Sequence, residues 1–111
     1  MIILDKPVSR IQLMNIEEHT YFDDMMKCVV DIKRECIAVN ADLEELLLRD
    51  GSSQKNLYGY NILYDDWSIE YDSLINPPRN REAGYPRAGR TVADPAVREK
   101  IREVTDKWIL K

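Results

Sequence analysis

The chain has 111 residues, of which 44% are apolar and 32% charged, and its formal net charge is −4 at pH 7. This length fits a single globular domain, residues 1–111, with a core of its own. No run of about 18 apolar residues occurs, so no membrane span is expected, and the acidic balance argues against a broad nucleic-acid-binding surface. The first residues have neither the basic lead nor the length of a signal peptide, and we therefore expect a cytoplasmic protein.

Residues 1–39 predict one strand, a short helix and a hairpin. Residues 1–4 form an apolar β-type run that Pro7 ends. Ser9 and Gln12 have the spacing of a capping box, which predicts a helix over residues 10–18. Residues 26–33 and 35–39 predict two strands. Alternation along the first of them places these apolar side chains on one face: Met26, Cys28, Val30 and Ile32.

The rest of the chain predicts two more helices and a second hairpin. Asn40 can cap a helix that Gly51 ends, with Leu43, Leu46 and Leu47 as its buried stripe. Residues 57–64 and 68–75 predict two strands joined by a short loop. The last helix begins at Pro95, since proline suits the first helical position. Its apolar residues recur at i, i+4, i+7 and i+11, namely Val97, Ile101, Val104 and Trp108.

The element order is therefore β-α-β-β-α-β-β-α, with hairpins as the commonest connection. Hairpins favour antiparallel pairing, and amphipathic helices need a sheet face to cover. We predict a two-layer α+β domain with a mainly antiparallel sheet of about five strands and three helices. The remaining residues, 76–93, predict one long loop rich in Arg, Pro and Gly, and a loop of that length is typically functional or mobile.

This loop carries the clearest functional signal. Its four arginines, Arg79, Arg81, Arg87 and Arg90, are opposed only by Glu82, so residues 79–90 carry net +3 and the rest of the chain −7. Arginine without lysine, set among Pro and Gly, is typical of forked recognition of a phosphate or carboxylate. The competing interpretation is a solvated loop whose arginines pair with acidic side chains elsewhere on the chain.

Two further groups of residues are candidates for chemistry. Asn61 lies beside Gly59 in a predicted strand, where it either satisfies nearby loop backbone or contacts a ligand. Its strand also carries tyrosines that predict a packed aromatic face, or alternatively a base-stacking platform. Three carboxylates, Asp31, Asp42 and Glu45, would bind a divalent cation or act as an acid–base pair if they converged. His19 has no motif around it, and the two cysteines, Cys28 and Cys36, are expected to be buried free thiols.

Several short stretches together resemble a small prokaryotic family of uncharacterised proteins, a domain of unknown function. The matching stretches are Val29-Val30-Asp31, Ala41-Asp42-Leu43-Glu44 through Leu48, Asp50-Gly51-Ser52-Ser53-Gln54, Tyr58-Gly59-Tyr60-Asn61, Tyr71-Asp72-Ser73-Leu74-Ile75-Asn76 and Asp94-Pro95-Ala96-Val97-Arg98. The family pattern has His where Asn40 stands and Trp where Tyr58 stands. The resemblance implies no known activity. It directs attention to polar residues at strand ends and turns, including Asn61, Ser73 and Asn76, which would line one cleft below the arginine loop if the hairpins lie side by side.

The sequence therefore supports three functional hypotheses. The first is a cytoplasmic binding module that holds a small anionic ligand or a nucleic-acid end through the arginines of the loop with Asn61, Ser73 and Asn76. The second is a cation-dependent hydrolase that uses the three carboxylates. The third is a homodimeric or accessory interaction protein that uses the tyrosine face or a strand edge. No motif indicates a cofactor, and no catalytic signature decides whether the chain is an enzyme.

Overall fold

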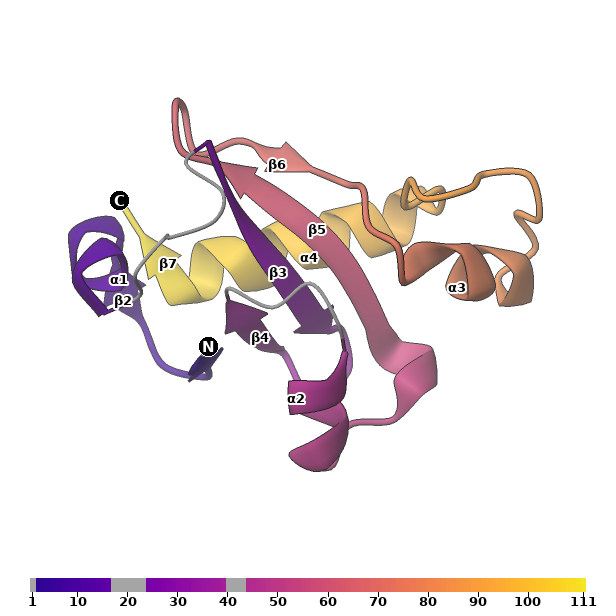
Figure 1. Cartoon of the computed structure of the whole chain (residues 1–111), viewed down its shortest axis with the longest axis horizontal. Coiled ribbons are helices and arrows are strands. Elements are labelled where there is room, and N and C mark those ends of the chain that lie inside the picture. Colours follow the sequence, from indigo (N-terminus) through magenta and orange to yellow (C-terminus); the bar gives the residue numbers. More distant parts are fainter. Residues whose placement is uncertain (1, 17–23, 40–43) are drawn as a thin grey trace.

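A computed structural model describes residues 2–16, 24–39 and 44–111 of the chain. The fold is α+β, with a five-stranded antiparallel sheet in the order β1-β4-β3-β5-β6 and a separate pair, β2 and β7, that is parallel (Figure 1). The strands are β1 (Ile2–Leu4), β2 (Val8–Ser9), β3 (Met25–Asp31), β4 (Cys36–Val39), β5 (Leu57–Leu63), β6 (Ile69–Glu70) and β7 (Ile109–Leu110). The α-helices are α1 (Arg10–Ile16), α2 (Glu45–Arg49), α3 (Asn76–Glu82) and α4 (Pro95–Trp108), and a 3₁₀ turn, η1, covers Gln54–Asn56. The predicted fold class is confirmed.

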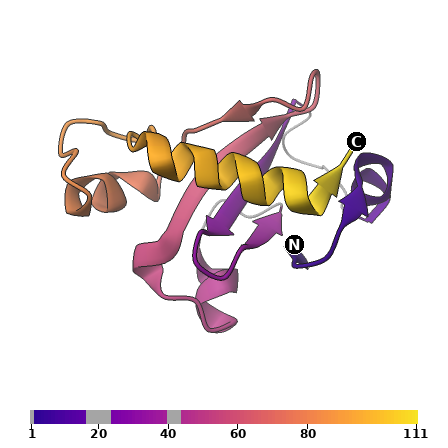
Figure 2. The same ribbon diagram turned by 180° about the vertical axis from the view of Figure 1, so that it is seen from behind.

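Helix α4 covers one face of the sheet (Figure 2). Its predicted stripe is confirmed, because Ile101 and Val104 are buried in the main core and Val97 and Trp108 pack against it. The β3 side chains predicted to share a face, such as Met26, lie in the same core. None of the helices in the described ranges is long and apolar enough to cross a membrane.

The tyrosines of β5 belong to this core. Tyr58 and Tyr60 are buried, and the Tyr60 hydroxyl lies 2.9 Å from Oγ1 of Thr105 in α4. Burial raises the pKa of both phenols, most strongly that of Tyr60. Both rings therefore lie in the main core, as the packed aromatic face predicted, and neither is open for base stacking.

The opposite face of the sheet holds a second, smaller core. Leu47 of α2 packs there with Ala38, Leu57 and Ile75. The predicted alternation of β3 is confirmed, since Val29 lies in this cluster. The two cysteines also lie on opposite faces, Cys28 in the main core and Cys36 in the second one, and both are buried free thiols as predicted.

The prediction of one long loop over residues 76–93 is wrong for its first part, because α3 occupies Asn76–Glu82. A proline in the first helical turn costs no hydrogen bond, so Pro77 and Pro78 begin this helix and do not prevent it. Gly84, at φ +94°, ends it in a Schellman motif: the N–H of Tyr85 donates to the Asn80 carbonyl (2.7 Å) and that of Gly84 to the Arg81 carbonyl (3.2 Å).

The strand predicted over residues 68–75 is also shorter than expected. Only Ile69–Glu70 pairs with β5, and one isolated bridge joins Asp72 to Thr91. After Glu70 the chain passes directly over Gly59 and then enters α3. The close approach is possible because Gly59 has no side chain.

The two short strands β2 and β7 pair with each other, which local sequence patterns did not predict. Val8 of β2 pairs with Ile109 of β7, directly after α4. The predicted capping box of α1 is present, with the Ser9 N–H donating to Oε1 of Gln12 (2.9 Å) and the Gln12 N–H to Oγ of Ser9 (3.0 Å). Predictions that involve His19, Asn40, Asp42 or Leu43 fall outside the described residues.

Candidate functional site

Helix α3 docks on the sheet through polar side chains. Asn76, Arg79 and Asn80 have the i, i+3, i+4 spacing of one helical face, and all three are buried. Because a buried polar group must find hydrogen-bond partners, each of these side chains fixes the helix to a defined place. The contacts of these three side chains therefore define the candidate site.

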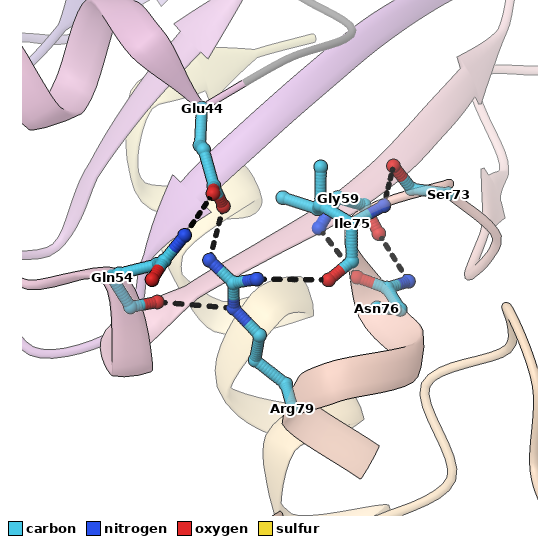
Figure 3. A network of polar contacts seen from close by, with 7 residues as sticks. All are labelled: Glu44, Gln54, Gly59, Ser73, Ile75, Asn76 and Arg79. Carbon is cyan, nitrogen blue, oxygen red and sulfur yellow. Dashed lines mark hydrogen bonds and ion pairs between the residues drawn. The ribbon is translucent and has the colours of Figure 1, made fainter. Parts of the chain in front are cut away.

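Asn76 joins α3 to the middle of β5 (Figure 3). Its Oδ1 accepts from the N–H of Gly59 at 2.8 Å, and its Nδ2 donates to the carbonyl of the same residue at 3.0 Å. The amide thus pairs with the Gly59 backbone as a neighbouring strand would. Nδ2 also donates to the carbonyl of Arg90 at 2.9 Å, which ties the end of the loop to the same point.

Asn80 holds the returning chain. Its Nδ2 donates to the carbonyls of Gly89 (2.8 Å) and Thr91 (2.6 Å), and its Oδ1 accepts from the N–H of Ala93 (3.3 Å). The side chains of Asn76 and Asn80 consequently fix residues 89–93, the far end of the loop, to α3.

Arg79, which was expected to contact a ligand, is buried inside the protein. Its guanidinium is 5% exposed and donates to the carbonyls of Gln54 and Ile75, each at 3.1 Å (Figure 3). It also forms an ion pair with Glu44, whose second carboxylate oxygen accepts from Nε2 of Gln54. All three nitrogens are used internally, so Arg79 attaches α3 to α2 and η1.

Asn61 and Ser73 are occupied by internal contacts as well. The Asn61 amide donates to Oε1 of Glu70 (2.9 Å) and to the Asp72 carbonyl (3.3 Å), which matches the interpretation that it satisfies nearby backbone. The Ser73 hydroxyl accepts from the N–H of Ile75 at 3.4 Å and lies directly over Gly59. The structure brings Ser73 and Asn76 together at Gly59, while Asn61 lies two residues further along β5.

The remaining arginines are on the surface, Arg81 in the last turn of α3 and Arg87 and Arg90 in the loop that follows. Arg81 and Arg87 are exposed, and neither side chain makes a hydrogen bond or ion pair within the part of the chain that the structure describes. Arg90 is half-exposed and pairs with Asp72 at 3.0 Å. A turn closed by the Ala88 N–H on the Tyr85 carbonyl (3.2 Å) places Arg87 near the tip of the loop.

The backbone of this loop also offers donors. Gly89 has φ +68°, a left-handed conformation, and the N–H groups of Gly89 and Arg90 donate to no acceptor within the described ranges. Successive amides around a left-handed residue can form a concave anion-binding nest. The exposed guanidinium group of Arg87 and these open amides are therefore found on the same short loop, next to Arg81 at the end of α3.

The carboxylates predicted for a metal site do not form one in the described residues. Asp31 is buried, and its Oδ1 accepts from the N–H groups of Lys33 and Arg34, both at 2.9 Å, which shapes the β3–β4 turn. Glu45 is exposed and pairs with Arg49 of its own helix at 2.5 Å. Within residues 2–16, 24–39 and 44–111 there is no group of three His, Cys, Asp or Glu side chains that could hold a metal ion. Asp42 lies outside these ranges.

The comparison with family models assigns the chain as a whole. Residues 2–108 match a family described as "Protein of unknown function (DUF5674)". The chain belongs to this family. The matched residues include the five-stranded sheet and the whole of α3 and α4, and the match confirms the resemblance to a domain of unknown function. No curated protein and no solved structure matches the chain.

The sequence did not predict that Glu44 and Gln54 contact Arg79, or that Asn80 holds the returning chain. A usable signal for Asn80 is its spacing, since it follows Asn76 by four residues and Arg79 by one, between a proline pair and Gly84. Glu44 and Gln54 offered no comparable signal, because they contact Arg79 only across long separations in sequence.

Proposed function

We propose that the protein binds an anionic, phosphate-containing ligand on residues 81–90, which comprise the end of α3 and the loop that follows. The observation that supports this most directly is that the guanidinium groups of Arg81 and Arg87 are exposed and have no partner within residues 2–16, 24–39 and 44–111, in a chain of net charge −4. In such a chain, surface arginines usually have acidic partners, as Arg34, Arg49 and Arg102 do. Arg81 and Arg87 are left available for a charge from outside.

The attachment of the loop supports the same proposal. Asn76 and Asn80 fix the backbone of residues 89–93, so the arginines are carried by an anchored scaffold. Preorganisation lowers the entropy cost of binding, because the ligand does not have to order the loop. The residues first predicted to touch the ligand, Arg79, Asn61, Ser73 and Asn76, have the supporting role.

Arg90 is the third cation of the proposed site. Its partner Asp72 is 38% exposed, and the two groups are 3.0 Å apart. An exposed pair of this kind is worth only about 0–1 kcal/mol, so a phosphate can compete with Asp72 for the guanidinium. Tyr85, which is 39% exposed, offers a ring for stacking if the ligand carries a base.

The test is ligand-dependent thermal stability. Inorganic pyrophosphate, ATP and a short oligonucleotide with either a 5′-phosphate or a 5′-hydroxyl are titrated while Tm is measured. A ligand present at 100 times its Kd stabilises the folded state by about 2.7 kcal/mol. For a domain near 100 residues this raises Tm by roughly 10 °C, since each kcal/mol is worth about 4 °C.

Variants then locate the effect. The double variant Arg81→Ala/Arg87→Ala should abolish the shift, and Asp72→Asn should enhance it by releasing Arg90. The control is Arg49→Ala/Arg102→Ala, which removes two exposed arginines from α2 and α4. The proposal is wrong if none of the probes gives a saturable shift, or if both double variants respond alike.

A further inference from the structure

A pocket of about 290 Å³ lies between α1 and the turn that follows β5. Figure 1 shows α1 at the opposite end of the molecule from α3, so this pocket is separate from the arginine loop. Its lining residues are Arg10, Ile11, Met14, Asn15, Tyr64 and Trp67. They combine an apolar and aromatic wall with one cation, as small-ligand sites often do.

Trp67, which lines the pocket, has an unfavourable backbone conformation. Its φ is +59°, in the left-handed region that a bulky residue rarely adopts. The turn itself is held by backbone bonds, from the Trp67 N–H to the Leu63 carbonyl (2.8 Å) and from the Leu63 N–H to the Ser68 carbonyl (2.9 Å). Glycine or asparagine would suit this position better, so the backbone does not explain the tryptophan. Its indole does contact Arg10.

The Arg10 guanidinium lies 4.9 Å from the centre of the Trp67 ring, a cation–π contact. Its Nε is buried and has no hydrogen-bond partner among the residues that the structure describes. In the described part of the chain no carboxylate forms an ion pair with Arg10. A buried N–H without an acceptor is costly, more so on a charged group, and an acceptor brought by a ligand would satisfy it.

We propose that this pocket binds a small molecule that carries one carboxylate on an apolar or aromatic body. The carboxylate pairs with the guanidinium of Arg10, whose forked N–H groups match its two oxygens. The body of the ligand lies against Trp67, Met14 and Ile11, and Ile11 is 75% exposed in the chain alone. The volume is near the lower limit for ligand pockets, which favours a molecule of roughly a dozen heavy atoms.

The test uses two probes that differ only in charge, 3-phenylpropionate and 3-phenylpropanamide. In ¹⁵N NMR titrations of the wild-type chain, the acid should move the Arg10 Nε–H and Trp67 indole N–H signals saturably. We expect the amide to bind at least tenfold more weakly, because hydrogen bonds to charged groups are the stronger ones. Equal affinity for acid and amide, or no movement of either signal up to 10 mM acid, a concentration near the weak limit for fragments, would overturn the proposal.

Variants separate binding from folding. Arg10→Met keeps the apolar stem and should lose binding of the acid at least tenfold, while Arg102→Met, an exposed arginine on α4, should not change it. Trp67→Gly removes the ring and relieves the left-handed conformation, but it also loses the packing of Trp67 against the main core and Tyr64. It should lose binding of the acid, and circular dichroism checks that the variant is folded before the titration. Undiminished binding in Arg10→Met or in Trp67→Gly would contradict the assignment.

Discussion

Gly59→Ala tests the contact on which the docking of α3 depends. An added Cβ at residue 59 would lie 2.1 Å from Oγ and 2.3 Å from Cβ of Ser73. Ordinary carbon contacts are about 3.5–4.0 Å, so the segment that carries Ser73 must retreat by more than about 1 Å. The Asn76 hydrogen bonds to Gly59, now 2.8 and 3.0 Å, would then be stretched beyond useful length.

The magnitude follows from these two effects. Overpacking a dense site costs about 1–3 kcal/mol, and leaving a buried donor and acceptor unpaired adds about 1–3 kcal/mol. We therefore expect Gly59→Ala to lower the free energy of unfolding by about 3–5 kcal/mol, a large part of the roughly 5–15 kcal/mol typical of a domain. In urea unfolding followed by circular dichroism, the midpoint should fall by roughly 2 M.

Two companion variants make the result specific. Ser73→Gly in the Gly59→Ala background removes both clashing atoms and should recover most of the loss. Gly84→Ala is the control, since that position has open space and only its φ of +94° opposes a side chain, at a cost of about 1–2 kcal/mol. A loss below about 1 kcal/mol for Gly59→Ala, or no recovery with Ser73→Gly, would refute the reasoning.

Two further predictions concern ion pairs at different depths. Arg79→Met should lower the free energy of unfolding by about 3–5 kcal/mol, because it leaves the largely buried carboxylate of Glu44 without its ion-pair partner. Arg81→Met, which changes an exposed arginine, should alter the free energy of unfolding by less than about 0.5 kcal/mol. Similar urea midpoints for the two variants would contradict this prediction. Glu35 accepts a hydrogen bond from Lys107 and lies near Lys100, and these contacts lower its pKa below the ordinary value of 4.5. The stabilisation from Glu35 is therefore present above pH 4.5 and is lost as the pH falls through the lowered pKa. The urea midpoints of wild type and Glu35→Gln should differ at pH 7 and converge near pH 2. A difference in midpoint that stays constant with pH would argue against this prediction.

The parts of the fold that could be predicted are those with a local apolar pattern. Val97, Ile101, Val104 and Trp108 repeat every three to four residues, which specifies both α4 and its buried side. The alternation of Met26 and Cys28 in β3 likewise assigns the face of the sheet. In these segments each residue's own preference and its tertiary setting agree, so local rules suffice.

Helix α3 could not be found in this way, because its buried stripe is Asn76, Arg79 and Asn80. The helical period is present, but the residues that carry it are polar, so a search for apolar periodicity passes over them. The pairing of Val8 with Ile109 depends on a contact between distant parts of the chain that no short pattern encodes. The cluster of arginines is evident in the sequence, yet the different roles of Arg79 and Arg81 depend on which of them faces Glu44.

The polar docking of α3 also determines how this part of the protein can change. Asn76, Arg79 and Asn80 form hydrogen bonds with backbone groups of other segments. Residues 86–88, at the tip of the loop, take no part in these bonds or in the Gly84–Tyr85 cap that ends α3. The tip can therefore be replaced with little effect on the attachment of α3. Such a division makes residues 86–88 a natural position at which a different recognition sequence could be inserted into the same scaffold.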